Sequence, residues 1–196
     1  MKQILFIGNS HTYYNDMAQT TFAGLARKAG LEVNITTVTR GGYFLHKYAD
    51  PEDLHGARLR EVIEGQHYDY VVLQDQSLCP IAEPEKFFRG VEGLHNLLKS
   101  QADRFVLYAT WSRHPDSPDL QKLGLSFHEL TQQVDAAYCE AGSRVGARVA
   151  HVGLAFEDSY APELFYPDMI HASPKGSALA ARVILDTILE MEKENG

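Results

Sequence analysis

Short apolar runs alternate with longer stretches of helical periodicity along the whole chain. The runs are apolar or β-branched and are bounded by turn residues, so they predict strands at 4–7, 33–39, 70–74, 105–109 and 148–152. Between them apolar side chains recur with a helical period, which predicts helices at 17–29, 54–64 and 84–98, one that begins near 117 and one that begins near 173.

Capping residues mark the ends of the first and last helices. Asn15 or Asp16 is expected to cap the first helix, and Gly30 is expected to end it because glycine adopts the left-handed conformation readily. Ser173-Pro174 pairs a capping hydroxyl with a proline at the first helical position, which predicts the start of the terminal helix.

A third helix start lies at Ser117-Pro118. The apolar positions that follow it predict one long helix, which includes Leu120, Leu123, Phe127, Leu130, Val134, Ala137 and Tyr138. Both Gly142 and Gly146 are suitable end points, so the pattern leaves the end of this helix open between them.

This alternation predicts a parallel sheet covered by helices on both faces, because parallel neighbours need crossover connections. We expect an α/β fold with a flavodoxin-like three-layer α/β/α sandwich and a five-stranded parallel sheet, built as a single domain over 1–196. The segments after the strands, at 8–16, 40–48, 74–83 and 110–118, are expected to gather at one edge, and the irregular segment 153–173 to join them there.

The first apolar run leads directly into Gly8-Asn9-Ser10-His11-Thr12. Ser10 therefore lies at the carboxyl end of a strand, the edge at which open α/β sheets bind their ligands. Its hydroxyl is a candidate nucleophile. The alternative is structural, since Ser10 or Thr12 is also a suitable cap for the helix that follows.

A second pair of polar residues lies shortly before the terminal helix. Asp168 and His171 are three residues apart, so the carboxylate can curl back to the imidazole within one turn and leave the other ring nitrogen for a hydroxyl. A surface histidine beside a helix-capping aspartate is the alternative for this pair.

Taken together, these blocks occur in the order found in the SGNH (GDSL-like) hydrolases, which the chain resembles over nearly its whole length. The resemblance implies that Ser10 is the nucleophile, His171 the general base and Asp168 the residue that orients it. It also implies an oxyanion hole formed by the backbone N–H groups of Ser10 and Gly42 and by a side-chain amide after the third strand. Glycine at 42 also permits a positive φ or a close backbone approach.

The chain departs from the family pattern in two places. The family commonly has Gly-Asp-Ser where this chain has Gly8-Asn9-Ser10, and its Gly-x-Asn-Asp block is replaced by the segment that contains Gln74 and Gln76. Either glutamine can donate an amide hydrogen bond, and both point to the same side of an extended chain. We favour Gln74, which directly ends the apolar run, as the third oxyanion donor. Alternatively, it only satisfies neighbouring loop amides.

Several aromatic residues share the same edge. His11 adjoins the nucleophile but has no acidic partner in its own segment, so it is expected in the pocket wall or in a loop hydrogen bond. Trp111 is expected either to line the substrate pocket or to pack in the core. The remaining aromatic residues at this edge, which either shape a cleft or cover the helices, are Tyr13, Tyr14, Tyr43 and Phe44.

Composition narrows the range of partners. The formal net charge is −8 with no basic cluster, which argues against a nucleic-acid partner. Cys79 and Cys139 belong to no CxxC motif and are expected to be free thiols, with a disulfide as the alternative. No metal and no cofactor is expected, because neither HExxH nor CxxC-type spacing is found around His46, His55, His67, His95, His114, His128 and His151.

The chain also lacks the sequence signals of membrane insertion. No apolar run approaches the ~18 residues of a membrane span, and no charged segment precedes a long apolar stretch. We therefore expect a cytoplasmic protein without a membrane span, although a chain whose signal peptide had been removed would show the same features. The pattern does not indicate an oligomeric state.

The predicted function is that of a serine esterase or acyl hydrolase acting on a small-molecule ester through an acyl-enzyme. The short loops leave little material for a deep lipid tunnel, so we expect a small acyl group such as acetyl, carried for example by a carbohydrate. A lipase, a lysophospholipase and a thioesterase are the alternatives within the same fold.

Two alternatives belong to other functional classes. In a non-catalytic phosphate or nucleotide binder of flavodoxin type, Gly8-Asn9-Ser10-His11-Thr12 would cradle a phosphate at the first helix. Against this interpretation, the turn has one glycine and no P-loop lysine, and the pair of Asp168 and His171 is unexplained. The other alternative is an inactive hydrolase fold that serves as an interaction module.

Overall fold

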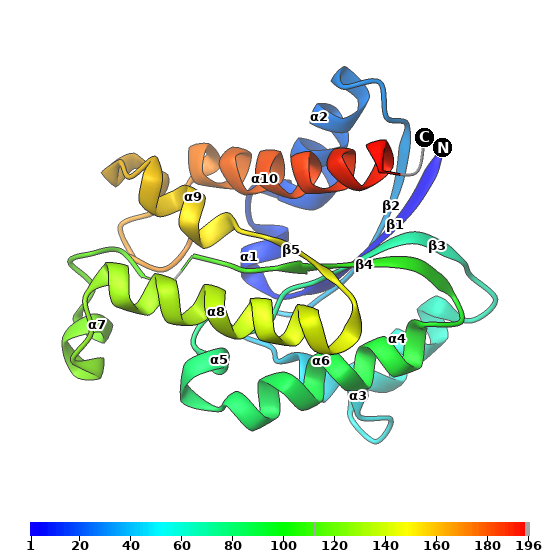
Figure 1. The fold of residues 1–196 in the computed structure, drawn as a ribbon, viewed down its shortest axis with the longest axis horizontal. Helices are drawn as coiled ribbons and strands as arrows, with labels where there is room; N and C mark the ends of the chain where they lie inside the picture. Colours follow the sequence, from blue (N-terminus) through cyan, green and yellow to red (C-terminus); the bar gives the residue numbers. More distant parts are fainter. Residues whose placement is uncertain (112, 195–196) are drawn as a thin grey trace.

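Five parallel strands form the middle layer of the computed structural model, which describes residues 1–111 and 113–194 (Figure 1). Their order in the sheet is β2-β1-β3-β4-β5. The strands are β1 (Lys2–Gly8), β2 (Val33–Thr39), β3 (Tyr68–Leu73), β4 (Ala102–Tyr108) and β5 (Arg148–Ala150). The predicted fold class is confirmed, and all five predicted strands are present.

Helices cover both faces of this sheet (Figure 1). One face carries α2 (Ala23–Lys28), α9 (Val152–Asp158) and α10 (Pro174–Lys193), and the other carries α3 (Leu45–Ala49), α4 (Leu54–Ile63), α6 (Pro84–Leu98) and α8 (Phe127–Val145). Ile4 and Phe6 of β1 pack into the first core, whereas Leu5 and Ile7 pack into the second. The unbroken apolar run in β1 is thus the signature of a strand buried on both faces.

The chain after β1 is more irregular than the periodicity predicts. It forms α1 (Ser10–Tyr13), a 3₁₀ turn over Tyr14–Asp16 and a π-helical segment over Met17–Phe22 before α2 begins. The prediction that Asn15 or Asp16 caps a helix here is wrong, since both adopt positive φ values, of 55° and 49°, and neither side chain caps the segment that follows. Gly30 does follow the end of α2 with φ 82°, as predicted.

The prediction of a single long helix from Ser117 is wrong, because this stretch forms two helices. Ser117 caps α7 (Pro118–Leu123), which ends at Gly124 with φ 66°. Ser126 then opens α8 with a capping box, in which its hydroxyl accepts the N–H of Glu129 and the carboxylate of Glu129 accepts the N–H of Ser126. Apolar periodicity continues across this break, so only the local signals Gly124 and Ser126 reveal it. The end of α8 lies at Gly146, with φ 68°.

The segments after the strands gather at one edge of the sheet and contain short helices that the pattern did not predict. These helices are α1, α3 and α5 (Cys79–Ala82). The prediction that 153–173 is irregular is wrong for the first part of this segment, which belongs to α9. Ser173 caps α10 by accepting the N–H of Gly176, as predicted.

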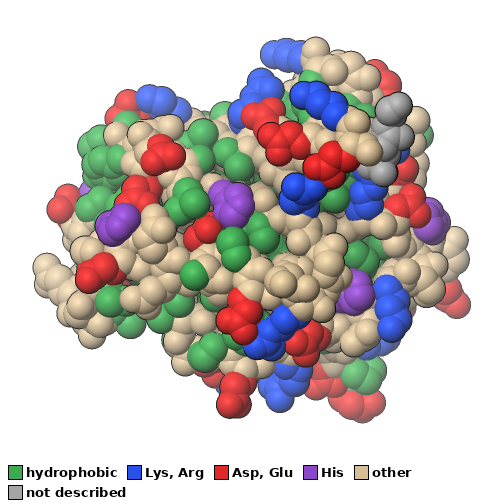
Figure 2. Space-filling model, in the orientation of Figure 1, with side chains coloured by type: hydrophobic (Ala, Val, Ile, Leu, Met, Phe, Trp, Pro, Cys, Tyr) green, Lys and Arg blue, Asp and Glu red, His purple; other side chains and the backbone are tan. Residues whose placement is uncertain are grey.

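Three further observations concern expectations drawn from composition. Cys79 and Cys139 are both free, as predicted, with Cys79 buried and Cys139 exposed. None of the helices in the described ranges combines the length and the apolar character that a bilayer-spanning segment needs. On the face shown in Figure 2, acidic and basic side chains are interspersed.

Candidate active site

Ser10 is the first residue of α1 and directly follows the cap residue of that helix. Asn9 accepts the N–H of His11 through Oδ1 at 3.2 Å and donates from Nδ2 to the carbonyl oxygen of Tyr43 at 3.0 Å. The N–H of Asn9 in turn donates to Oε1 of Gln74 at 3.1 Å. The turn that carries Ser10 is therefore fixed to the loops after β2 and β3.

Asp168 and His171 lie in a tight loop closed by an isolated bridge between Phe165 and Ala172. Oδ1 of Asp168 accepts the N–H groups of Ile170 and His171, both at 2.9 Å. Oδ2 accepts Nδ1–H of the His171 ring at 2.7 Å. The carboxylate thus shapes the loop with one oxygen and orients the imidazole with the other, which explains the spacing of three residues.

The two segments meet at Ser10, where Nε2 of His171 lies 2.9 Å from Oγ. Burial alone would raise the pKa of the Asp168 carboxyl, but hydrogen bonds from the side chain and N–H of His171 outweigh this effect and hold the pKa below its ordinary value. Tyr14 stacks flat on the His171 ring, with centroids 4.1 Å apart and an interplanar angle of 5°. An ionised carboxylate, an oriented imidazole and a hydroxyl in hydrogen-bonding sequence can move a proton off the hydroxyl.

Asn15 ties these two segments together, a role that the sequence analysis missed. Its Nδ2 donates to the carbonyl oxygen of Ala172 at 3.0 Å and to Oγ of Ser177 at 2.8 Å, and its Oδ1 accepts the hydroxyl of Tyr166 at 2.6 Å. Asparagine tolerates the left-handed conformation found here better than most residues, which is the one local signal in the sequence.

Ser10 and His171 open onto a cavity of about 220 Å³. Gly42 contributes to its wall with φ 64°, a conformation that glycine adopts without strain, as expected for this position. Of the residues that line the cavity, Ile170 carries the aliphatic side chain and the others are polar or glycine: Asn9, Ser10, His11, Gly42, Gln76, Ser77, Arg113 and His171.

The structure separates the two candidate glutamines. Gln74 does not line the cavity: its Oε1 accepts the N–H of Asn9 and, at 2.9 Å, the hydroxyl of Thr12, and its amide nitrogen donates to the carbonyl oxygen of Asp75. Gln76 lines the cavity, and its Oε1 accepts two backbone N–H groups at the start of α5, which leaves the donor capacity of its amide nitrogen for another acceptor. The geometry therefore favours Gln76 over our sequence-based preference, Gln74, as an oxyanion donor.

Asp75 joins the loops that carry Gly42 and Gln76. Its Oδ1 accepts the N–H of Leu45 at 2.9 Å and the N–H of Gln76 at 2.7 Å, and the residue is fully buried. Burial raises the pKa of the Asp75 carboxyl to about 7, although the two N–H groups act in the opposite direction. Asp75 is therefore a buried acid that fixes the loop after β2 relative to the loop after β3.

We predict that Asp75→Asn stabilises the protein at alkaline pH. Between about pH 4 and pH 7 the folded protein holds a proton on Asp75 that the unfolded chain has lost, so the free energy of unfolding falls as the pH rises through this interval. The amide mimics the protonated acid and removes this dependence. Urea unfolding should therefore show an advantage for the variant that is about 2–3 kcal/mol larger at pH 8 than at pH 5, because most of the linkage free energy is lost above pH 5. An identical pH dependence for both proteins would contradict this assignment.

Arg113 is a second residue that the sequence analysis missed. It is buried in the cavity wall, donating from Nη1 to Oγ of Ser77 at 2.6 Å and from Nε to Oδ2 of Asp119 at 3.1 Å. Nothing in the local sequence distinguishes it from a surface arginine.

His11 lies in the cavity wall beside this arginine. Burial, followed by the charges of Arg113 and His171, holds the pKa of His11 well below its ordinary value. Its Nδ1 lies 2.8 Å from Oγ1 of Thr110. His11 is thus a neutral wall residue, in line with the expectation of a pocket wall or a loop hydrogen bond.

Trp111 lies behind His11 and does not reach the cavity lining. Its ring stacks between His11, at 4.2 Å, and Phe156 of α9, at 4.6 Å, and its Nε1 donates to the carbonyl oxygen of Ile170 at 2.8 Å. Of the two interpretations of Trp111, core packing describes the observed position. The contact with Ile170 also supports the loop that carries His171.

The remaining aromatic residues at this edge lie outside the cavity lining. Tyr43 donates its hydroxyl to Asp53, Tyr13 is half-exposed, and Phe44 directly precedes α3. Among the described residues, the cluster of three side chains suited to a metal lies at Asp135, Cys139 and His151, none of which lines the cavity.

No family model and no curated protein matches the chain. Among solved structures, a protein of Slackia heliotrinireducens described as an SGNH hydrolase is 32% identical, with a TM-score of 0.83 over 95% of this chain and 98% of its own. A DUF4886 family protein from Bacteroides uniformis is 16% identical, with a TM-score of 0.76 over 95% of this chain and 82% of its own.

The acetylxylan esterase Axe2 from Geobacillus stearothermophilus is 17% identical, with a TM-score of 0.65 over 95% of this chain and 94% of its own. Structures have also been solved of Axe2 catalytic mutants at a serine and at an aspartate and a histidine three positions apart. The likeness to Axe2 and to the Bacteroides uniformis protein shows a shared fold.

Proposed function

The chain belongs to the SGNH hydrolase family, and we propose that it is a serine esterase that removes a small acyl group, acetyl in the first place, from a small-molecule ester. The observation that carries this proposal is the chain of hydrogen bonds from Asp168 through His171 to Ser10, with distances of 2.7 Å and 2.9 Å. Such an arrangement activates a serine hydroxyl for attack on a carbonyl carbon.

The reaction we propose has two halves. In the first, Oγ of Ser10 attacks the ester carbonyl while Nε2 of His171 takes its proton, and the protonated ring then gives that proton to the departing alcohol. In the second, water attacks the acyl-enzyme with His171 again as the base, and Ser10 recovers its proton as the acid leaves. Asp168, with its lowered pKa, stays ionised and stabilises the imidazolium that forms in each half.

Negative charge develops on the carbonyl oxygen in both halves. We assign its stabilisation to the backbone N–H groups of Ser10 and Gly42 and to the side-chain amide of Gln76, because all three residues border the cavity. The buried guanidinium of Arg113 adds a positive charge to the same wall.

The cavity supports a small acyl group. A long acyl chain needs a continuous apolar groove, whereas the described residues that line this cavity include one aliphatic side chain, that of Ile170. The fold shared with an acetylxylan esterase agrees with acetyl as the acyl group and with a carbohydrate as the alcohol.

An acyl-length series tests this assignment. We expect kcat/KM to be highest for p-nitrophenyl acetate and to fall steeply through butyrate to octanoate, and we expect acetate release from acetylated xylo-oligosaccharides. A preference for octanoate would replace the proposed acetyl specificity by that of a lipase. If none of these esters is hydrolysed, the esterase assignment itself is wrong.

We predict that Gln76→Ala lowers kcat by about 10²–10³-fold, because one oxyanion donor contributes about 3 kcal/mol to transition-state stabilisation. The matched variant Gln76→Glu keeps the oxygen that accepts the N–H groups of Leu78 and Cys79 but removes the amide donor, so it should lose at least as much activity with the loop intact. Steady-state kinetics on p-nitrophenyl acetate should show the loss in kcat and not in KM.

Gln74→Ala provides the comparison for Gln76. It leaves the buried N–H of Asn9 without its acceptor, so we expect a lower melting temperature as the main effect. A loss in kcat of less than tenfold for both Gln76 variants would show that Gln76 is not an oxyanion donor.

A further inference from the structure

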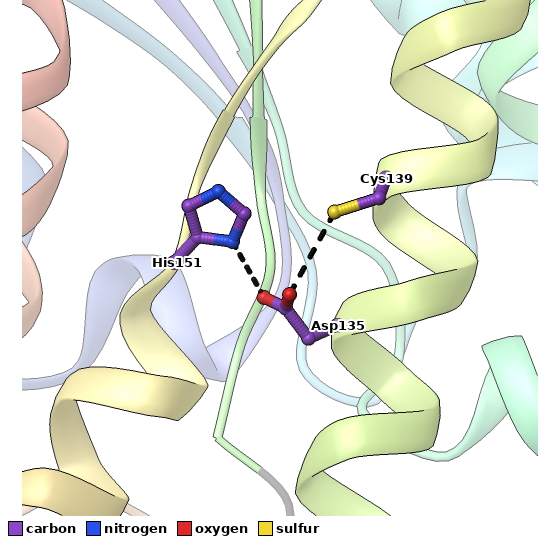
Figure 3. Close-up of side chains that lie close together, drawn as sticks. All are labelled: Asp135, Cys139 and His151. Atoms are coloured by element: carbon purple, nitrogen blue, oxygen red, sulfur yellow. Dashed lines mark hydrogen bonds and ion pairs between the residues drawn. The ribbon is translucent and has the colours of Figure 1, made fainter.

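Three side chains with metal-binding atoms converge on the surface of α8, outside the site described above. Asp135 and Cys139 lie one turn apart on α8, and His151 lies between β5 and α9 (Figure 3). Nδ1 of His151 is 2.7 Å from Oδ1 of Asp135, and Sγ of Cys139 is 3.7 Å from Oδ2 of the same carboxylate. The three candidate ligand atoms all lie within 4.8 Å of one another.

We propose that Asp135, Cys139 and His151 form a binding site for a divalent transition-metal ion of the zinc class. One sulfur, one imidazole nitrogen and one carboxylate oxygen are the donor types that Zn²⁺ takes in proteins. Ca²⁺ and Mg²⁺ do not fit this site, because they bind to sets of oxygen ligands.

The observed geometry needs only a small adjustment to receive such an ion. Bonds of about 2.0–2.3 Å in a tetrahedron place neighbouring ligand atoms roughly 3.3–3.7 Å apart. Sγ of Cys139 already lies at this distance from Oδ2 of Asp135, whereas Nδ1 of His151 contacts the other oxygen, Oδ1. To present one oxygen to the ion the carboxylate has to rotate, and the contact with His151 has to open by about half an ångström. The His151 side chain is 46% exposed, so its ring can turn without moving a buried group. The exposed side of the cluster leaves the fourth position to water.

The charge balance at the cluster also suits a cation. The Asp135 side chain is only 12% exposed, and its hydrogen-bond and ion-pair partners in the described part of the chain are the Cys139 thiol and the His151 ring. A carboxylate so far withdrawn from water gains more from a nearby positive charge than a fully exposed one does. A bound divalent ion supplies that charge.

A metal ion at this place would fasten the start of α9 to α8. The second residue of α9, Gly153, donates its N–H to the carbonyl oxygen of Ala109 at 2.9 Å, and Phe156 of the same helix stacks on Trp111. Binding would therefore stabilise the packing behind the esterase site without adding a group to it. The proposal is independent of the esterase reaction.

Cobalt titration tests the proposal directly. Tag-free protein, reduced and freed of metal with a chelator, is titrated with Co²⁺, which reports a thiolate ligand by a charge-transfer band in the near ultraviolet. We expect one Co²⁺ per chain with this band, displacement of the band by Zn²⁺, and a Zn²⁺-dependent rise in melting temperature of about a few degrees.

Variants assign the ligands. Cys139→Ser should abolish the band, whereas Cys79→Ala, which removes the other thiol, should keep it. His151→Ala should weaken Co²⁺ binding at least about tenfold. His128→Ala is the matched control, because His128 of α8 pairs with a carboxylate, that of Glu157 of α9, outside the cluster, and the variant should bind Co²⁺ as the unchanged protein does. Absence of the band from the unchanged protein, or its survival in Cys139→Ser, would overturn the proposal.

Discussion

Ser10→Ala is expected to lower kcat on p-nitrophenyl acetate by roughly three to six orders of magnitude, the largest effect of any single substitution in this chain. The reason is that in the proposed reaction the hydroxyl oxygen is the atom that bonds to the acyl group, and within the described residues it is the group that lies 2.9 Å from Nε2 of His171. Removal of one oxygen from a small side chain should leave the melting temperature nearly unchanged. Kinetics and thermal unfolding on the same preparation measure both.

Ser77→Ala is the matched control for this variant. Ser77 lines the same cavity and accepts a hydrogen bond from Arg113, whereas within the described residues the hydroxyl bonded to Nε2 of His171 is that of Ser10. It should retain activity within about tenfold of the unchanged enzyme, since it loses no bond-forming atom. Activity above about one per cent in Ser10→Ala would mean that Ser10 is not the nucleophile.

His171→Ala is expected to be nearly as damaging as Ser10→Ala, and the double variant should be no worse than either single one. Residues that act as one unit in catalysis have strongly non-additive effects, because the loss of one leaves the other without a partner. Measurement of kcat for the two single variants and the double variant tests this. Multiplicative losses would show that Ser10 and His171 act separately.

Asp168→Asn separates the role of Asp168 in shaping the loop from its role in stabilising the protonated His171 ring. The amide oxygen can still accept the N–H groups of Ile170 and His171, so the loop should keep its shape. The amide cannot stabilise the imidazolium, however, and we expect kcat to fall by about 10³–10⁴-fold with little change in KM.

Most of the fold follows from the sequence because each strand is a short apolar run with a clear boundary. The terminal helix was predicted correctly at Ser173-Pro174 for the same reason, since both its signals are local. The break between α7 and α8 was missed because apolar periodicity continues through it, and Gly124 was outweighed by that pattern. The helix break there is set by Gly124, which ends α7, and by Ser126, which caps α8.

The candidate site was predictable to a different degree in each of its parts. Asp168 and His171 are close in sequence, so their pairing can be read from spacing, and Ser10 is marked by the strand that precedes it. The sequence could not distinguish Gln74 from Gln76 as the oxyanion donor, because the choice depends on where each side chain points. The direction of the Gln74 side chain is set by its hydrogen bond with the N–H of Asn9, which lies in another segment. Arg113 and Asn15 were missed because the partners that tie them to the site, Ser77 for Arg113 and Ala172 and Ser177 for Asn15, lie far away in sequence.

The central claim is that the Ser10 hydroxyl is activated by the imidazole of His171. Labelling with a fluorophosphonate probe, followed by mass spectrometry of the digested protein, tests it most directly, because the probe reacts with activated serines without requiring the natural substrate. The account predicts a single modified residue, Ser10, and loss of the label in His171→Ala. Modification of another residue, or equal labelling of Ser10 in His171→Ala, would contradict it.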